Sequence, residues 1–197
     1  VLGFLVFAGL LAGRFVCGWL CPFGLVQELL HKIPLRKIRI PKKVNSILKW
    51  VKYFILLIFV ILLPILTVDS FGLSTPYFCK YICPAGTLEG GLPLLLLNKS
   101  LRTAVGFLFS WKLLILILVI AASIVIFRPF CRYLCPLGAF YSFFNSVSLY
   151  RYQIDSSKCI KCGKCSGSCK MDIDVCKKPN SPECIRCGAC VRACPTG

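Results

Sequence analysis

Long apolar stretches separated by short polar ones make up the chain as far as about residue 150. We expect membrane-spanning helices over residues 1–16, 50–68 and 104–127, where the apolar runs approach the length that a bilayer requires. Lysine and tryptophan side chains at the start of the second span can anchor it at the membrane interface and compensate for its short apolar core. Pro64 is expected to kink this span near its far end.

The apolar pattern stops near residue 150, and the segment that follows is polar, basic and rich in cysteine. This change predicts a membrane domain over residues 1–149 and a small second domain over residues 150–197. A mean hydropathy of +0.79 and a hydrophobic share of 57% are far above those of soluble domains and favour membrane insertion. The only methionine is Met171 and the sequence opens inside an apolar run, so we expect further helical sequence upstream of residue 1.

Basic residues are distributed unevenly around the expected spans. They are dense in residues 31–52 and from residue 128 onward, and sparse in residues 69–103. Because cytoplasmic loops of membrane proteins carry the excess of lysine and arginine, we expect residues 17–52 and 128–197 on the cytoplasmic side of the cytoplasmic membrane. The first basic block also suits an anionic lipid surface. Topology and lipid therefore account for the net charge of +17 better than a nucleic-acid partner does.

A nine-residue pattern occurs three times, each time near the end of an expected span. It reads apolar–Cys–x–x–aliphatic–Cys–Pro–x–Gly over residues 16–24, 78–86 and 130–138, which we name the first, second and third repeats. Their cysteine pairs are Cys17 and Cys21, Cys79 and Cys83, and Cys131 and Cys135. Cysteines four residues apart lie on one face of a helix, and the proline and glycine are expected to stop that helix and turn the chain. Each repeat should thus present two thiols at a helix end.

Two chemical roles and one packing role are open for these thiols. A buried cysteine can act simply as a small hydrophobic residue, but three copies of one pattern favour a redox role. The thiols can be ligands of a further iron–sulfur cluster, or they can cycle between dithiol and disulfide. The expected topology puts the first and third repeats on one side, where their four cysteines could form one site, and the second repeat on the other side.

The strongest pattern lies in the last segment, where C-x2-C-x2-C-x3-C occurs twice. The first run is Cys159, Cys162, Cys165 and Cys169, and the second run is Cys184, Cys187, Cys190 and Cys194. This is the spacing of bacterial ferredoxins with two [4Fe–4S] clusters, in which the fourth thiolate of each run ligates the other cluster. The predicted ligand sets are therefore Cys159, Cys162, Cys165 and Cys194 for one cluster, and Cys184, Cys187, Cys190 and Cys169 for the other. A zinc ribbon needs only paired C-x2-C knuckles, so two complete runs favour clusters.

Several single residues also carry expectations. Cys176 is left over from both runs and is interpreted as a bystander, while Lys170, directly after the first run, should raise the potential of the nearby cluster. The lone histidine, His31, is expected to be a solvated surface residue. Gln27 and Glu28 lie close to the first repeat, where they could touch a quinone head group or a proton path or form an ordinary polar face.

The repeats combined with the two runs resemble the membrane-bound ferredoxin-type proteins. These include the polyferredoxin subunit of periplasmic nitrate reductase systems and the membrane part of the nitrous-oxide-reductase regulator. The resemblance covers nearly the whole chain and implies a quinol-linked electron carrier on the cytoplasmic membrane. Those proteins typically have two such repeats, so the third repeat is a departure.

The sequence thus predicts an α-helical polytopic membrane domain joined to a small α+β domain of the bacterial ferredoxin type on the cytoplasmic side. We expect it to pass electrons between a quinone or soluble donor and a redox partner protein, as a subunit of an oxidoreductase system rather than a stand-alone enzyme. Two [4Fe–4S] clusters are the predicted cofactors, and a further cluster and a quinone are compatible with the sequence. Two other hypotheses stay open: a thiol-redox or maturation factor that uses the repeat dithiols, and a redox-sensing regulator.

Overall fold

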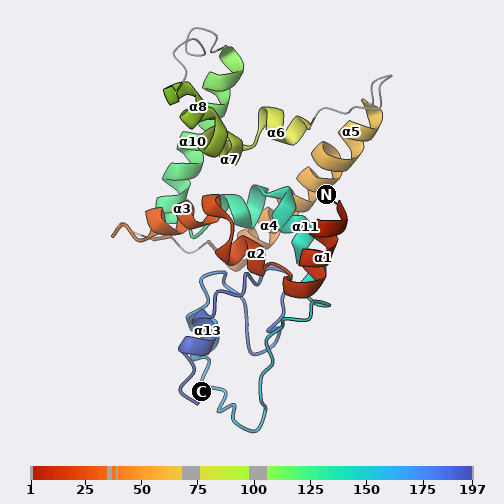
Figure 1. Ribbon diagram of the computed structural model, residues 1–197. Coiled ribbons are helices and arrows are strands. Elements are labelled where there is room, and N and C mark those ends of the chain that lie inside the picture. The colour runs from red at the N-terminus through yellow and green to blue at the C-terminus, as the bar shows by residue number, and fades with distance from the viewer. Residues whose placement is uncertain (1, 35–36, 39, 68–75, 98–105, 197) are drawn as a thin grey trace. The chain divides into compact units, whose positions relative to one another are not determined.

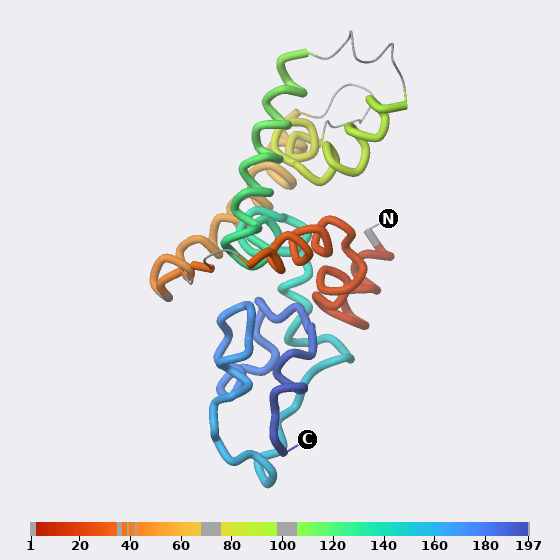
Figure 2. Tube along the Cα trace, turned by 90° about the vertical axis from the view of Figure 1, so that its left-hand side faces the viewer, coloured from red at the N-terminus to blue at the C-terminus, as the bar shows by residue number. Residues whose placement is uncertain are grey.

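Every regular element in the described part of the chain is a helix (Figure 1). The computed structural model describes residues 2–34, 37–38, 40–67, 76–97 and 106–196. Over the described residues of the ferredoxin-type segment the backbone forms loops, turns and two short helices, so the α+β character of that domain is not confirmed. Figure 2 follows this segment as a series of loops near the C-terminus.

The first half of the chain holds helices α1 (Leu2–Ala12), α2 (Phe15–Trp19), α3 (Pro22–His31), α4 (Lys42–Ile55), the π-helix η1 (Leu56–Leu62), α5 (Leu63–Leu66), α6 (Tyr77–Tyr81), α7 (Pro84–Gly86), the π-helix η2 (Thr87–Gly91) and α8 (Leu92–Leu97). The second half holds α10 (Phe107–Val125), the π-helix η3 (Phe130–Leu134), α11 (Pro136–Phe144), α12 (Lys164–Gly167) and α13 (Ala189–Arg192).

Two helices are long and apolar enough to cross a membrane. One is the continuous helix Lys43–Leu66, formed by α4, η1 and α5, and the other is α10, Phe107–Val125. Only 11% and 17% of the residues in their most apolar windows are buried within the protein, so neither is the core helix of a soluble domain. The predicted span over residues 1–16 contains α1, which at 11 residues is shorter than these two helices.

Pro64 does not break the first long helix. A proline inside a helix has no N–H to donate and its ring clashes with the carbonyl four residues earlier. Here the preceding turns widen into η1, and the N–H of Leu63 reaches back to the carbonyl of Ile58. A π segment of this kind accommodates the proline within a continuous helix.

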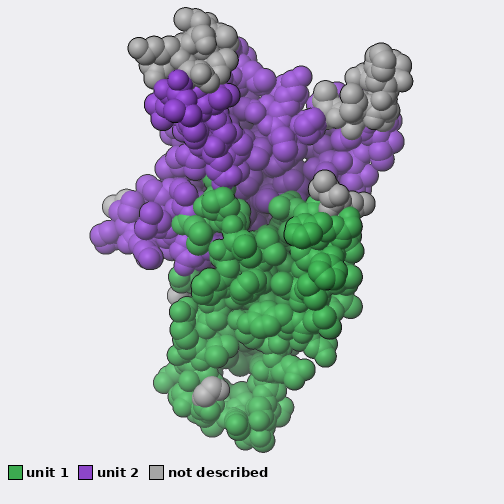
Figure 3. Space-filling view, in the orientation of Figure 1, with its two compact units in different colours: residues 1–25, 137–197 green, residues 26–136 purple. Residues whose placement is uncertain are grey.

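The chain forms two compact units, coloured separately in Figure 3. Unit 1 joins Val1–Leu25 to Leu137–Gly197, and unit 2 is Val26–Pro136. The sequence predicts a boundary near residue 150, whereas the compact unit that holds the ferredoxin-type segment also contains α1, α2 and most of α11.

In unit 1 the two chain ends are joined by backbone and ring contacts. The N–H groups of Leu149 and Tyr150 donate to the carbonyls of Leu10 and Leu11 at the end of α1. Gly9 lies against the ring of Phe144, and a side chain there would meet that ring at 3.0 Å. The segment that leads into the two runs is thus fixed to the end of α1.

In unit 2 the short helices after residue 76 fold back against the long ones. Helices α7 and η2 pack on α10, and α6 packs on η1 (Figure 1). Helix η3 packs on α4, where the hydroxyl of Tyr133 donates to the side-chain oxygen of Asn45 at 2.9 Å. Helix α8, Leu92–Leu97, continues from η2 at the end of this group of short helices.

Candidate iron–sulfur sites

The two four-cysteine runs have the same backbone geometry. Lys161 and Arg186, each two residues after the first cysteine of its run, have φ values of 53° and 54°. Gly163 and Gly188, each directly after the second cysteine, have φ values of 72° and 75°. A short helix that carries the third cysteine begins after each glycine, α12 in the first run and α13 in the second. Two left-handed residues per loop curl the chain tightly, as a loop must to place three thiolates around one cluster.

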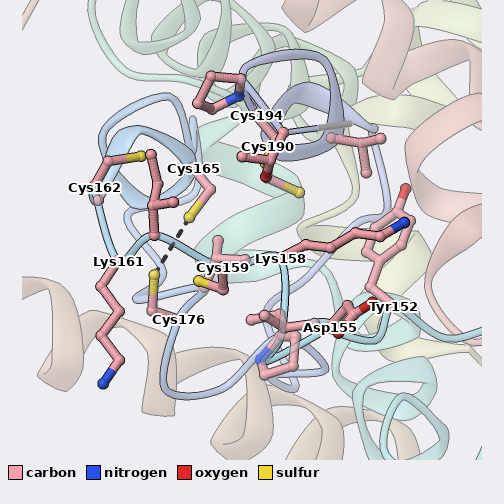
Figure 4. Close-up of a pocket in the computed structure, with 18 of the residues that line it drawn as sticks. Tyr152, Asp155, Lys158, Cys159, Lys161, Cys162, Cys165, Cys176, Cys190 and Cys194 are labelled. Carbon is pink, nitrogen blue, oxygen red and sulfur yellow. Dashed lines mark hydrogen bonds between the residues drawn. The ribbon is translucent and has the colours of Figure 1, made fainter.

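The cysteines of the two runs line two cavities. Figure 4 shows a cavity of about 290 Å³ lined by Cys159, Cys162, Cys165, Cys176, Cys190 and Cys194. A second, smaller cavity is lined by Cys169, Cys184, Cys187 and Cys190. The four cysteines of each predicted ligand set line one cavity, and Cys190 lines both, so the division into ligand sets stays a prediction.

Four thiols at ferredoxin spacing are a donor set that fits a [4Fe–4S] cluster. Among the described residues no three histidine, cysteine, aspartate or glutamate side chains converge on one metal position. A cubane takes one thiolate at each of four irons, so its ligands stand further apart than those of a zinc ion. Burial raises the pKa of the Cys184 and Cys190 thiols, and backbone N–H groups of Arg186 and Val191 oppose this effect by donating to the two sulfurs. Backbone N–H donors of this kind also suit cluster thiolates.

The two loops differ sharply in burial. Ile160 in the first run is 66% exposed, whereas Ile185 at the equivalent place in the second run is 2% exposed. Lys161 is likewise exposed, and its equivalent Arg186 is 2% exposed. The first run thus faces solvent within unit 1, and the second run packs against the rest of that unit.

Side chains from outside the second run hold its backbone. The amide of Asn145 donates to the carbonyls of Ser181 and Cys184 at 2.7 and 2.9 Å. The indole N–H of Trp19 and the hydroxyl of Tyr152 both donate to the carbonyl of Arg186 at 3.3 Å. Trp19 lies in the first repeat, so this repeat contacts the second run directly.

Two further features hold the second run at the first repeat, one formed by residues just before each of them and one within them. The guanidinium of Arg14 pairs with the carboxylate of Glu183 at 3.1 Å and donates to the carbonyl of Pro182 at 2.9 Å. Gly18 lies so close to Ile185 that a side-chain carbon on it would stand 2.3 Å from the Ile185 carbonyl oxygen. Only glycine permits this approach of two backbones.

The three repeats share one local structure. In each, the N–H of the second cysteine donates to the carbonyl of the residue before the first cysteine, at 3.1, 2.9 and 2.9 Å. The proline then begins the next helix, which is α3, α7 or α11. The prediction of thiols at helix ends is confirmed. The prediction that both cysteines share one helical face is wrong, because the helix ends before the second cysteine, and the glycine lies inside the following helix rather than in a turn.

The second and third repeats lie together in unit 2. The rings of Phe78 and Phe130, each directly before the first cysteine of its repeat, stack with centroids 6.5 Å apart. The ammonium of Lys112 in α10 donates to the carbonyl of Cys79 at 2.8 Å. The predicted separation of the second repeat from the third is therefore wrong, because the segment after residue 76 folds back along α10. Part of the predicted loop 69–103 lies outside the described residues.

Polar side chains of α3 contact the third repeat. The amide of Gln27 accepts the N–H of Phe130 at 3.2 Å and donates to the sulfur of Cys131 at 3.4 Å. Glu28 pairs with Arg128 at 2.6 Å. Gln27 therefore orders the backbone and one thiol of the repeat, and Glu28 holds the arginine that lies two residues before the repeat.

His31 is half-buried, so the prediction of a solvated surface residue is wrong. Its Nδ1 lies 3.3 Å from the carbonyl of Ser123, and its ring packs edge-on against Phe127. The amphipathic pattern of α3 could not reveal this contact, because the partner lies about ninety residues away along the chain.

Cys176 is not distant from the clusters' ligands, although the sequence suggests a bystander. Its sulfur lies 3.4 Å from that of Cys165, as the dashed line in Figure 4 shows. Hydrogen bonding to Cys165 raises the pKa of the Cys176 thiol. A spare thiol at this distance can replace its neighbour as a ligand.

We therefore expect a Cys165→Ala variant to retain the iron of both ferredoxin-type clusters, with Cys176 bound in place of the missing thiolate. The double variant Cys165→Ala/Cys176→Ala should lose one cluster's iron and sulfide, and Cys176→Ala alone should lose none. Iron and labile-sulfide analysis of the purified proteins checks this. Loss of a cluster in Cys165→Ala alone would contradict it.

Helices fit to cross a membrane, combined with two ferredoxin-type runs, define a membrane-bound ferredoxin-type protein. One family model, described as a 4Fe-4S binding domain, matches residues 1–41, 53–99 and 108–150, and each match contains one repeat. A second 4Fe-4S binding domain model matches residues 179–197, which hold the second run. The first model alone matches more than half of the chain. The chain therefore belongs to this family of 4Fe-4S binding domain proteins, and the resemblance noted from the sequence is confirmed.

Several curated proteins are similar to the chain. It is 32% identical over 177 residues to the uncharacterized protein MJ0750 of Methanocaldococcus jannaschii, covering 86% of the chain and 63% of that protein. It is 30% identical to YccM of Escherichia coli, whose name proposes an electron transport protein, over 90% of the chain and 46% of YccM. It is also 30% identical to the regulatory protein NosR of Pseudomonas aeruginosa, over 82% of the chain and 21% of NosR. The chain thus spans less than two thirds of these relatives. No solved structure matches it.

Proposed function

We propose that the chain is an electron-transfer unit of the cytoplasmic membrane that passes electrons between a soluble or quinone donor and a membrane-associated redox partner. It is an iron–sulfur protein by family, and the two ligand sets described above hold [4Fe–4S] clusters in this proposal. When bound, such clusters accept and release single electrons. The chain supplies their ligands, burial and surrounding charge.

One observation carries the proposal: the second run is packed directly on the first repeat. Gly18 stands in backbone contact with Ile185, and Trp19 donates to the carbonyl of Arg186. Both residues lie between Cys17 and Cys21 of a repeat that matches a 4Fe-4S binding domain. The exposed first run offers the opposite end of the same path to a soluble partner. Electrons would enter or leave at that end and reach the membrane segment through the second run.

The repeats serve in this proposal as ligands of a further cluster, and their thiols, numbered above, are the candidates. The match of the 4Fe-4S family to each repeat supports this role. The contact of Phe78 with Phe130 favours the second and third repeats as the pair that cooperates, in place of the first and third. Gln27, which donates to the sulfur of Cys131, would then orient one ligand.

The membrane topology is part of the proposal. The ferredoxin-type segment lies on the cytoplasmic side, because the basic residues of the chain are concentrated in residues 31–52 and 128–197. A reporter that is active only in the cytosol, fused after residue 197, should therefore be active. A reporter that is active only outside, fused at the same position, should be silent.

The function is tested on the full chain, purified anaerobically in detergent. We expect about eight irons and eight labile sulfides for the two runs, and about four more of each for every cluster at the repeats. Reduction with dithionite should bleach the visible absorbance and produce electron paramagnetic resonance signals of paired [4Fe–4S] clusters. Addition of a water-soluble quinone should restore the absorbance. Bound zinc without iron, or clusters that no quinone or soluble acceptor reoxidises, would contradict the proposal.

Serine variants of the repeat cysteines separate cluster ligation from dithiol chemistry. If the repeats are ligands, Cys131→Ser should lower the iron content by one cluster while the two ferredoxin-type clusters remain. If the repeats are dithiols, iron should be unchanged and alkylation after reduction should be lost at that position. Serine at all six positions with full iron and full electron transfer would leave only a packing role.

A further inference from the structure

A buried positive charge, Arg186, lies within the second run, whereas Lys161 at the equivalent position of the first run is exposed. Arg186 is 2% exposed, and it lines the same cavity as the predicted ligands of the second cluster. Its guanidinium donates to the carbonyls of Ala12 and Asn145 and to the hydroxyl of Ser148. It also lies 5.6 Å from the centroid of the Tyr150 ring.

All these partners are neutral. Among the described residues no carboxylate pairs with Arg186, and its buried Nε has no hydrogen-bond partner. A buried guanidinium keeps its charge, and no hydrogen-bond partner of Arg186 in the described part of the chain carries a negative charge that would cancel it. The titratable groups that act electrostatically on Arg186 are the thiol of Cys184, in the second run, and the hydroxyls of Tyr152 and Tyr150.

The other basic residues around the runs do not act in the same way. Lys161, at the equivalent position of the first run, is exposed and therefore screened by water and salt. Lys170, which the sequence singled out as a charge that tunes the potential, is exposed as well. Arg14 is fully buried, but Glu183 neutralises its charge. Arg186 is thus the basic side chain beside the runs that combines burial with neutral partners.

A glycine in the backbone leaves room for the guanidinium of Arg186. Gly13, between α1 and α2, has a φ of 54°, and a side-chain carbon on it would stand 2.9 Å from Nη1 of Arg186. The guanidinium therefore lies in the seam between the second run and the turn that leads into the first repeat. It is close both to the second cluster's ligands and to the start of the path into the membrane segment.

We propose that Arg186 raises the reduction potential of the cluster at the second run above that of the cluster at the first. It thereby fixes the direction in which an electron moves between the two clusters. A reduced cluster with four thiolates carries one more negative charge than an oxidised one, so a fixed positive charge at low dielectric favours the reduced form. One electron that enters at the exposed first run then moves to the second run, and no bond is made or broken. The electron collects next to the first repeat.

This inference rests on the proposed cluster binding, and the experiment keeps the two apart. Iron content tests whether clusters are bound. Redox titration followed by electron paramagnetic resonance tests which of the two clusters has the higher reduction potential. The resonance of each cluster is identified from the signal that changes in a Cys159→Ser or a Cys184→Ser variant.

In Arg186→Gln we expect the potential at the second run to fall by at least 59 mV, which is a tenfold change in the equilibrium constant of a one-electron couple. The potential at the first run should change much less. Arg186→Lys retains the charge and should largely retain the potential. Lys161→Gln is the matched variant at the equivalent exposed position. For both clusters, its change in potential should correspond to less than a threefold change in the equilibrium constant of reduction.

A second variant covers the case in which Arg186→Gln fails to hold its cluster. Ser148→Asp places a carboxylate beside the guanidinium and neutralises its field without removing the side chain. It should lower the potential at the second run in the same direction as Arg186→Gln. Full iron content with unchanged potentials in Ser148→Asp, or equal shifts in Arg186→Gln and Lys161→Gln, would overturn the inference.

Discussion

Replacement of Arg14 by methionine is expected to lower the stability of unit 1 by about 3–5 kcal/mol, because it leaves the carboxylate of Glu183 buried without its partner. The side chains of Arg14 and Glu183 are 0% and 9% exposed, and their closest atoms lie 3.1 Å apart. Methionine has a similar volume and therefore isolates the loss of the charge from the loss of packing. The midpoint of thermal bleaching of the cluster absorbance should fall accordingly.

The chain offers a matched control for this ion pair. Lys177 and Asp174 lie 3.7 Å apart with side chains that are 83% and 52% exposed. Exposed pairs contribute about 0–1 kcal/mol, so Lys177→Met should leave the bleaching midpoint nearly unchanged. If Arg14→Met and Lys177→Met lowered the bleaching midpoint equally, burial of the Arg14 pair would not explain its contribution to stability.

Replacement of Gly18 by alanine is expected to push the second run away from the first repeat. The added carbon would stand 2.3 Å from the carbonyl oxygen of Ile185, and backbone atoms on both sides leave no flexible side chain to yield. Overpacking of this kind costs about 1–3 kcal/mol. In addition to lower thermal stability, we expect faster removal of iron from the second run by a chelator, because the loop that holds three of its ligands loses its support.

Gly3→Ala and Gly86→Ala are the controls for Gly18→Ala. Both glycines lie in helices, and a side-chain carbon on either would meet nothing within 4 Å. Alanine is the better helix former by up to about 1 kcal/mol, so these variants should be neutral or slightly stabilised. A Gly18→Ala variant as stable as these two, with unchanged iron release, would show that the close approach is unimportant.

The spacing of the cysteines predicts two ligand sets with an exchanged fourth thiolate, and in the structure the members of each set line one cavity. This was possible because a cluster fixes the distances between its ligands within a few residues, so the constraint is local. The left-handed glycines Gly163 and Gly188 follow from the same local demand. The lengths of the apolar stretches likewise indicated the two long helices, since the bilayer sets those lengths directly.

The differences between similar sequence elements depended on contacts that no local pattern contains. Lys161 and Arg186 occupy equivalent positions, and only the packing of the second run against α1 and α2 buries one charge and leaves the other in water. The repeats look alike along the chain, yet Phe78 of the second repeat contacts Phe130 of the third, fifty-two residues away. The charge pattern predicts these two repeats on opposite sides of the membrane. One signal was present: Gly18 stands where the other repeats carry Lys80 and Arg132.

The sequence by itself thus determined the thiols, their spacing and the apolar helices, because these depend on residue type and short-range spacing. Only the tertiary structure decided which run contacts the first repeat, which repeats lie together and which charge is buried. Those outcomes arise from residues far apart along the chain, such as Gly18 with Ile185, Gln27 with Cys131 and Phe78 with Phe130. Their contacts depend on how the whole chain packs and leave no period or spacing in the sequence.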